Sequence, residues 1–294
     1  MAVAAEGPPL HRRRLGKRLA PYLLLAPALL WLVVFFVVPI VQMFFISLQE
    51  GNVDQGFVLT WNWAAYPEVL STYDTQLIRS VVYGLIVTLA CLGIGYPLAY
   101  AIAFRGGRWK TALLFMVVLP FFVSYLIRTI SWKFILADDG FVLGTLKDLG
   151  VLGEAYRVLA TPTAVIFGLV YNFLPFMVLP LYVSLEKIDP SMIEAAEDLY
   201  AHRWAAFRRV TLPLSLPGVF AGSLLTFIPA MGDFINASLL GNPNTTMIGN
   251  VIQREFLAKN DYPEAAAISF VLMAAILIGV ALYAKLLGTE ELTG

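Results

Sequence analysis

Blocks of twenty or more apolar residues, separated by short polar segments, constrain this sequence more than any other feature. A helix needs about 20 apolar residues to cross a hydrocarbon core of about 30 Å, whereas barrel strands alternate in runs of about ten. Charged residues make up 14% of the chain and hydrophobic residues 59%, while a soluble domain carries about a quarter charged residues. The sequence therefore predicts an all-α polytopic membrane protein.

The apolar blocks number about six, and each is long enough for one transmembrane helix. Several of them contain internal prolines, which predict kinks, because neighbouring helices can satisfy the carbonyls that a proline frees. The predicted spans are residues 22–47, 77–104, 111–136, 162–185, 214–240 and 265–288. The internal prolines include Pro27, Pro39, Pro97, Pro120, Pro175, Pro180 and Pro229.

Basic residues before the first block give it the look of a signal peptide, but the run from Tyr22 to Ser47 far exceeds a signal h-region of about 7–15 residues. We interpret it as the first membrane helix. With the N-terminus inside, inside segments hold thirteen lysines and arginines and outside loops four. This asymmetry predicts a cytoplasmic basic tail at 1–21, a membrane domain at 22–288 and a cytoplasmic C-terminus at 289–294.

Several function classes find no support in the composition. Twenty basic and twenty acidic side chains cancel, so nucleic acid is not an expected partner. The Gly16-Lys17 pair is followed by Arg18 and lacks the upstream glycine of a phosphate-binding loop. His11 and His202 have no further metal-ligating residues at suitable spacing. We expect no metal and no cofactor on this chain.

The polar segment 186–213 predicts two short amphipathic helices. Asp189 can cap the first, Pro190 suits its first position, and an apolar stripe alternates with an acidic face. We expect Leu212-Pro213 to end the second. Helices this short cannot cross the bilayer, so they lie at its cytoplasmic surface, against another protein or resting on lipid. The stripe consists of Met192, Ala195, Ala196 and Leu199, and the acids are Glu194, Glu197 and Asp198.

Glu194-Ala195-Ala196, followed by Val210-Thr211-Leu212-Pro213, resembles the EAA loop of bacterial ABC importer permeases. The resemblance implies the type I importer permease (MetI-like) fold and a coupling helix at 190–201 that docks on a separate ATPase. Tyr200 stands where the family usually has glycine, so the turn after this helix must be made differently. The resemblance assigns coupling to Glu194, Ala195, Ala196, Leu199, Tyr200 and Ala201.

Three further segments resemble the spermidine/putrescine permease group, its B-type subunits in particular: Leu119-Pro120-Phe121-Phe122, the stretch from Tyr171 to Pro180, and Gly232-Asp233. The resemblance implies a multi-pass permease of the bacterial inner membrane, surrounded by lipid. Its implied partners are a second permease subunit, two ATP-binding cassette subunits that use ATP and Mg, and an extracytoplasmic substrate-binding protein. The same machinery carrying another small solute, a membrane enzyme, and a passive channel or assembly protein remain alternatives.

Polar side chains inside predicted spans are costly unless paired or hydrated, so each is a candidate for the substrate path. Asp233 falls within the span 214–240, and its alternative role is an ion pair with Arg128 of the third span. Aromatic rings can line a cation route, although packing or a place in the interface belt is their commoner role, and the candidates are Tyr125, Trp132, Tyr171 and Phe176. The predicted path residues are Asp233, Arg128, Trp132, Tyr171, Asn172 and Asn236.

Overall fold

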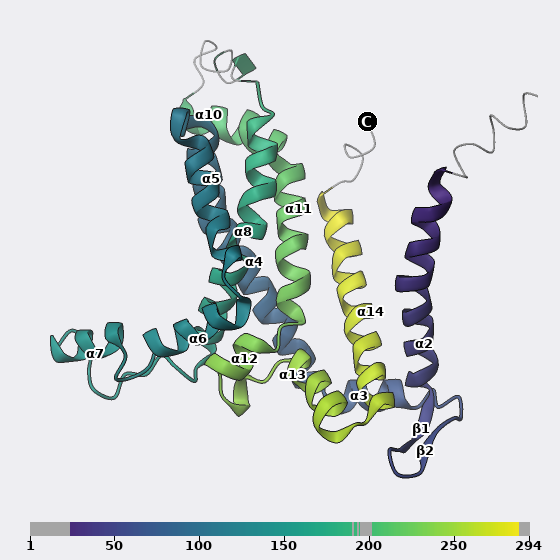
Figure 1. Ribbon diagram of the computed structural model, residues 1–294. Helices are drawn as coiled ribbons and strands as arrows, with labels where there is room; N and C mark the ends of the chain where they lie inside the picture. The colour runs from purple at the N-terminus through teal and green to yellow at the C-terminus, as the bar shows by residue number, and fades with distance from the viewer. Residues whose placement is uncertain (1–23, 190, 193, 195–201, 288–294) are drawn as a thin grey trace, which may run out of the picture.

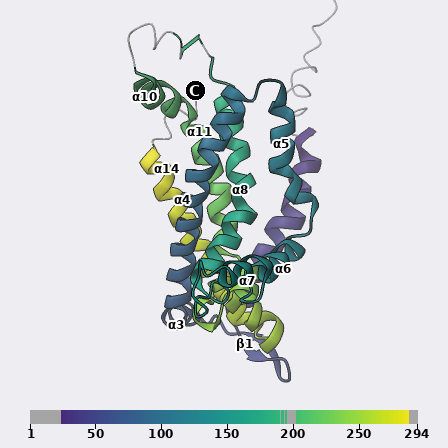
Figure 2. The ribbon, with the colours of Figure 1, turned by 90° about the vertical axis from the view of Figure 1, so that its left-hand side faces the viewer.

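Three helices pack side by side as the centre of the molecule, in a computed structural model that describes residues 24–287 except 190, 193 and 195–201 (Figures 1 and 2). They are α4 (Asp74–Arg105), α8 (Pro162–Glu186) and α11 (Leu212–Met231). Cys91, Leu169 and Met177, where these helices meet, are fully buried. The apolar blocks supply this core, and their outward faces remain apolar, as expected for helices in lipid.

Glycines on α11 let it approach α8 closely. A Cβ on Gly218 would lie 2.4 Å from the Cβ of Ser184 and 2.8 Å from the carbonyl oxygen of Pro180. A Cβ on Gly222 would lie 2.9 Å from the Sδ of Met177. Small residues at such a crossing bring the backbones into van der Waals contact, which is the main attraction between helices in a membrane.

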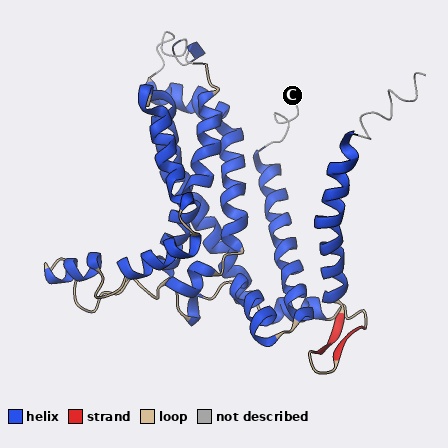
Figure 3. Ribbon diagram, viewed as in Figure 1, coloured by secondary structure: helices blue, strands red, loops and turns tan. Residues whose placement is uncertain are grey.

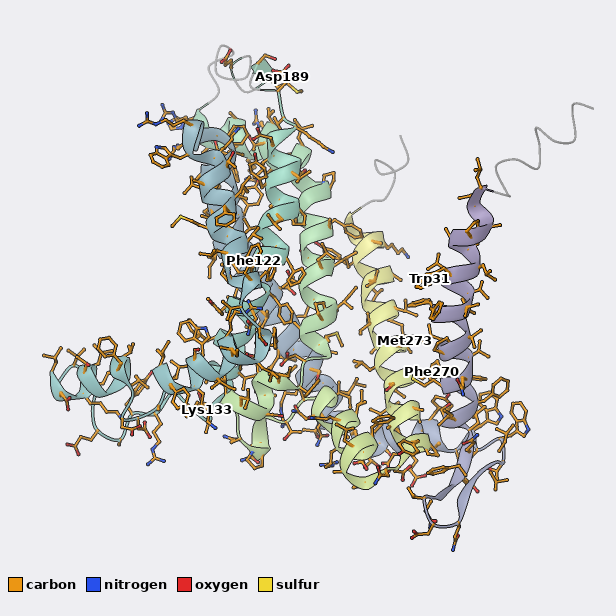
Figure 4. The ribbon with its side chains drawn as sticks, in the orientation of Figure 1. Trp31, Phe122, Lys133, Asp189, Phe270 and Met273 are labelled. Atoms are coloured by element: carbon orange, nitrogen blue, oxygen red, sulfur yellow. The ribbon has the colours of Figure 1, made fainter. Side chains whose placement is uncertain are left out.

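Two helices stand apart from this centre: the first span, Leu24–Ser47, and α14 (Tyr262–Leu287). The first span includes η1 (Val33–Val37) and α2 (Val38–Ser47), and α2 packs against α14, where Phe44 meets Phe270 with ring centroids 5.7 Å apart. Apolar side chains such as Trp31 project from it along its length (Figure 4). Exposed apolar helices of this kind need lipid or another apolar surface around them.

The two ends of the bundle differ. The hairpin end carries the antiparallel strands β1 (Gln49–Asn52) and β2 (Gly56–Leu59), drawn red in Figure 3. Short helices gather there too: α3 (Ala65–Thr72), α7 (Phe141–Asp148), α12 (Ile235–Leu240), η5 (Pro243–Thr245), α13 (Ile248–Gln253) and η6 (Arg254–Lys259). The start of the first span, the last turn of α14 and α10 (Arg203–Ala206) lie at the opposite end, called here the termini end (Figure 1). The hairpin was not expected from the sequence.

The prediction of one helix over 111–136 is wrong. After η2 (Gly107–Trp109), α5 (Lys110–Val118) and η3 (Leu119–Phe122), the chain turns by 92° into α6 (Tyr125–Ile135). Val123 and Ser124 between them have extended backbones, with ψ of 136° and 138°. Pro120 has no N–H to continue the helical hydrogen bonds, which favours the change. In the part of the chain that the structure describes, five other helices are long and apolar enough to cross a membrane, which makes six spans if this bent pair counts as one.

The fifth span also differs from its prediction of 214–240. Its helix begins at Arg203, continues through the π-helical turn η4 (Phe207–Thr211) and α11, and ends at Met231. Leu212-Pro213 therefore does not end a separate short helix. Asp233 lies in the break between α11 and α12, not inside a helix as expected.

Candidate substrate path and coupling segment

Asp233 is the centre of a buried polar network at the hairpin end. Its carboxylate is 8% exposed and accepts three hydrogen bonds. The Tyr125 hydroxyl on α6 donates to Oδ2 at 2.5 Å. Asn236 donates to Oδ1 through its backbone N–H at 2.8 Å and its side-chain amide at 3.3 Å. These donors replace water around a charge that would otherwise be costly to bury.

The network continues onto α8 through two amides. Asn236 Nδ2 also donates to the Tyr125 hydroxyl at 2.6 Å, and its Oδ1 accepts from Asn172 Nδ2 at 3.3 Å. Asn172 Nδ2 lies 3.3 Å from Thr129 Oγ1 as well. Its Oδ1 is buried and has no hydrogen-bond partner among the described residues. The site therefore holds one acceptor that lacks a donor.

Gly168 makes the contact between α8 and α12 possible. A Cβ at this position would lie 2.4 Å from Leu240 Cδ1 and 2.6 Å from Asn236 Oδ1. Any larger side chain would push the Asn236 amide out of the network. The four-residue spacing places Gly168 on the same face of α8 as Asn172.

Arg128 lies beside the network without an ion pair. Its side chain is 8% exposed, and its Cζ lies 5.6 Å from the ring centroids of both Phe121 and Tyr125. Within the described residues, no carboxylate lies within 4.0 Å of Arg128, and its Nε and Nη1 have no hydrogen-bond partner. The predicted alternative, an ion pair with Asp233, is therefore wrong for this arrangement.

Trp132 and Tyr171 form a separate aromatic cluster. The Trp132 ring meets Phe167 at 4.6 Å and Tyr171 at 5.2 Å between centroids, both nearly edge to face. In the described structure neither residue is hydrogen-bonded to Asp233. The structure thus brings Asp233, Asn172 and Asn236 together and leaves these two rings packed against each other.

A series of rings leads from the network toward a groove between α8 and α11. Tyr125 faces Phe173 at 6.3 Å, Phe173 faces Phe176 at 6.0 Å, and Phe176 faces Phe121 at 5.0 Å between centroids. Phe176 also lines the groove, which has a volume of about 750 Å³. The other lining residues are Leu179, Pro180, Val183, Ser184, Lys187, Ile188, Asp189, Met192, Leu214, Pro217, Gly218, Ala221 and Leu225.

The groove reaches the predicted coupling segment at the termini end, where Figure 4 labels Asp189. Asp189 Oδ1 accepts the backbone N–H of Ser191 at 2.9 Å, which confirms its predicted capping role. Hydrogen bonds from Ser191, the backbone one first, lower the pKa of the Asp189 carboxyl. Glu194 is helical and exposed. The other predicted coupling residues, Ala195, Ala196, Leu199, Tyr200 and Ala201, lie outside the described residues.

A second ionic cluster fixes the hairpin end. Glu255 of η6 is fully buried, with Arg254 Nη2 at 2.9 Å and Lys259 Nζ at 2.8 Å. The Tyr73 hydroxyl, between α3 and α4, donates to Glu264 at 2.7 Å and to Glu255 at 3.4 Å. Burial acts to raise the pKa of Glu255, but Lys259 and Arg254 outweigh it and lower that pKa. This cluster ties α14 to the start of α4.

Sequence reasoning missed Thr129 as a member of the site, and it considered Tyr125 only as an aromatic ring that can line a cation route, not as a hydrogen-bond donor to Asp233. Both lie on α6 four residues apart, with Arg128 between them, so they share one face of that helix. This spacing was visible in the sequence. The break before Tyr125, which turns that face toward Asp233, was not.

The fold and these polar groups define an integral membrane transport subunit. Residues 92–287 match the family of binding-protein-dependent transport system inner membrane components, and the chain belongs to this family. It is therefore the multi-pass inner-membrane permease of an ABC importer, as predicted, and not an enzyme or a passive channel.

Individual relatives agree with this assignment. The chain is 39% identical over 260 residues to the "Spermidine/putrescine transport system permease protein PotB" of Haemophilus influenzae, covering 84% of this chain and 88% of that protein. It is 35% identical to the "Inner membrane ABC transporter permease protein YdcU" of Escherichia coli, covering 75% and 74%. The crystal structure of a bacterial importer of the acidic polysaccharide alginate has the same fold, with a TM-score of 0.68, 21% identity and coverage of 94% and 98%.

Proposed function

We propose that this permease imports polyamines such as spermidine or putrescine. The observation that carries the proposal is its 39% identity, over most of its length, to a permease named for that transport. In this reading Asp233, Asn172 and Asn236 lie on the substrate path, with Arg128 beside it. Trp132 and Tyr171 support the path by packing beside Asn172.

The chemistry of the network suits a substrate with several ammonium groups. Asp233 supplies a negative charge, and Asn172 Oδ1 supplies an acceptor without a donor. An ammonium group is a compact donor that can satisfy both. The rings of Tyr125, Phe173 and Phe176 offer faces that attract a cation between this site and the groove. The groove then ends at a second carboxylate, Asp189.

The remaining machinery belongs to partners. A second permease subunit would cover the exposed apolar faces that lipid does not, and an external binding protein would deliver substrate at the hairpin end. Two ATP-binding cassette subunits would hydrolyse ATP with Mg and dock on residues 190–201. The first span begins and α14 ends at the same end of the bundle (Figure 1). This arrangement, and the excess of lysine and arginine in the segments predicted to lie inside, support two cytoplasmic termini.

Reconstitution tests the proposal directly. The complex of this chain with its companion permease, ATPase and binding protein, in proteoliposomes containing ATP, should accumulate radiolabelled spermidine or putrescine. Unlabelled polyamines should compete, whereas amino acids and sulfate should not. The matched control omits the binding protein. A complex that hydrolyses ATP and accumulates neither polyamine contradicts the proposal.

Import of a different small solute by the same machinery is the second candidate. The observation that favours it is Arg128, a buried cation that could hold an anionic group beside Asp233. Under this alternative the binding protein would ignore polyamines. A thermal-shift screen of that protein with polyamines, amino acids and inorganic anions separates the two.

A further inference from the structure

Arg128 is the one charged side chain of the predicted path whose polar atoms are left without partners in the described structure. Arg128 is 8% exposed as a whole residue, and its Nε and Nη1 are buried and donate to no group among the described residues. Burying a cation without a counter-ion is strongly unfavourable. The Phe121 and Tyr125 rings, 5.6 Å from Cζ, compensate in part through cation–π attraction. An apolar residue would pack here at lower cost, so stability alone does not explain an arginine.

Tyr125 connects this cation to the carboxylate. Its ring lies against the guanidinium in a cation–π contact, and its hydroxyl donates to Asp233 Oδ2. A substrate ammonium bound at Asp233 would therefore lie next to the same tyrosine. It would share the ring with Arg128 and be repelled by a like charge across a buried site, where charges interact more strongly than in water.

We infer that the positive charge of Arg128 opposes binding of the substrate's ammonium group at Asp233. The substrate is then held there weakly enough to be released rapidly. This rests on the proposed polyamine path. A transport site must bind strongly enough to admit its substrate and weakly enough to let it leave. A carboxylate among aromatic rings would bind an ammonium group tightly, and repulsion from the buried arginine lowers that affinity. Arg128 acts here as a positioning and specificity residue, and Asp233 makes the contact.

The proposal predicts a result opposite in sign to a simple loss of function. Arg128→Gln and Arg128→Met remove the competing charge, so the substrate should stay longer. Arg128→Lys keeps a cation and should behave like the native chain. Lys133→Gln is the matched control, because Lys133 is an exposed cation of the same helix (Figure 4) and makes no hydrogen bond to the network in the described structure.

The experiment uses the full complex with its binding protein and radiolabelled spermidine. The complex is arrested with vanadate during turnover, free ligand is removed, and spermidine retained per complex is counted. Arg128→Gln should retain at least fivefold more than the native complex, and its maximal uptake rate should fall at least threefold. Arg128→Lys and Lys133→Gln should stay within twofold of native on both measures.

Each other outcome overturns the inference. Native retention in Arg128→Gln refutes it and leaves the proposed function standing, provided that the native complex takes up spermidine. A change of equal size in Arg128→Lys shows that the charge is irrelevant. Failure of both neutral variants to assemble, with Arg128→Lys assembling, assigns a purely structural role. Absence of spermidine uptake by the native complex refutes the proposed function and this inference with it.

Discussion

Replacing Asp233 by asparagine separates a transport role from a structural one, because it removes the charge and keeps the shape. Oδ1 can still accept the backbone N–H of Asn236. The hydrogen bond from the Tyr125 hydroxyl is lost, because the amide nitrogen that replaces Oδ2 cannot accept it, and the bond from the Asn236 side chain loses its charge assistance, at about 1 kcal/mol each. Since no ion pair joins Asp233 to Arg128, no cation is newly stranded. We expect a loss of about 2 kcal/mol in stability and normal assembly.

The effect on transport should be larger than the effect on stability. An ammonium 4 Å from a carboxylate gains about 4 kcal/mol at an effective dielectric constant of about 20. Desolvation of the two charges offsets part of this gain, which leaves about 2–3 kcal/mol. Asp233→Asn should therefore lower spermidine uptake by about 30- to 150-fold, at about 1.4 kcal/mol for each factor of ten.

The assay measures initial uptake into proteoliposomes, divided by the amount of assembled complex. The affinity of the binding protein for spermidine, measured on that protein alone, should not change. Glu68→Gln is the matched control, since Glu68 is an exposed carboxylate of α3 at the same end of the bundle. If Asp233→Asn assembles normally and transports within twofold of native, the carboxylate has no part in the path.

Three further outcomes follow from the structure. Glu194→Lys should leave folding intact and reduce uptake at least tenfold while the ATPase still turns over, and normal ATP-driven uptake would contradict the coupling assignment. Gly218→Ala should cost about 2 kcal/mol or more in unfolding experiments, because its Cβ would meet Ser184, whereas Gly93→Ala, with open space around it, should cost nothing. The Glu255 carboxylate should stabilise the native chain above the ordinary glutamate pKa of about 4.3, and this stabilisation should be lost as pH falls through the lower folded-state pKa. Glu255→Gln should remove this pH-dependent part of the stability. Equal profiles of unfolding free energy against pH for the two chains would contradict this.

The spans were predictable because membrane insertion depends on apolar length, which a sequence displays directly. The breaks were not. Leu119 to Phe122 are as apolar as the residues before them, and the span ends there because Val123 and Ser124 adopt extended backbones. Hydropathy contains no information on that conformation, and Pro120 alone is compatible with a kinked helix as well as with a right-angle turn.

The polar members of the site were predictable as individuals, and their grouping was not. Asp233, Asn172 and Asn236 attract attention because polar groups inside apolar blocks are costly. Their contacts join α6, α8 and α12, with partners 43 to 111 residues apart in the chain. An ion pair between Asp233 and Arg128 would also lower the cost of burying the two charges. The structure shows instead that Tyr125 contacts both residues, with its hydroxyl on Asp233 and its ring against Arg128.

The two breaks in the bundle stabilise each other, and this determines how the site can respond to motion. Irregular backbone at membrane depth persists only where protein or water satisfies it. Here Tyr125, just after the break between η3 and α6, donates to Asp233 in the break between α11 and α12. Asn172 of α8 adds a hydrogen bond to Asn236, which belongs to the same network. The segment 186–213 joins α8, which ends at Glu186, to the helix that begins at Arg203 and leads to Asp233. We therefore expect a displacement of that segment to reach both sides of the network along α8 and α11, which are in direct contact, without requiring α6 to move first.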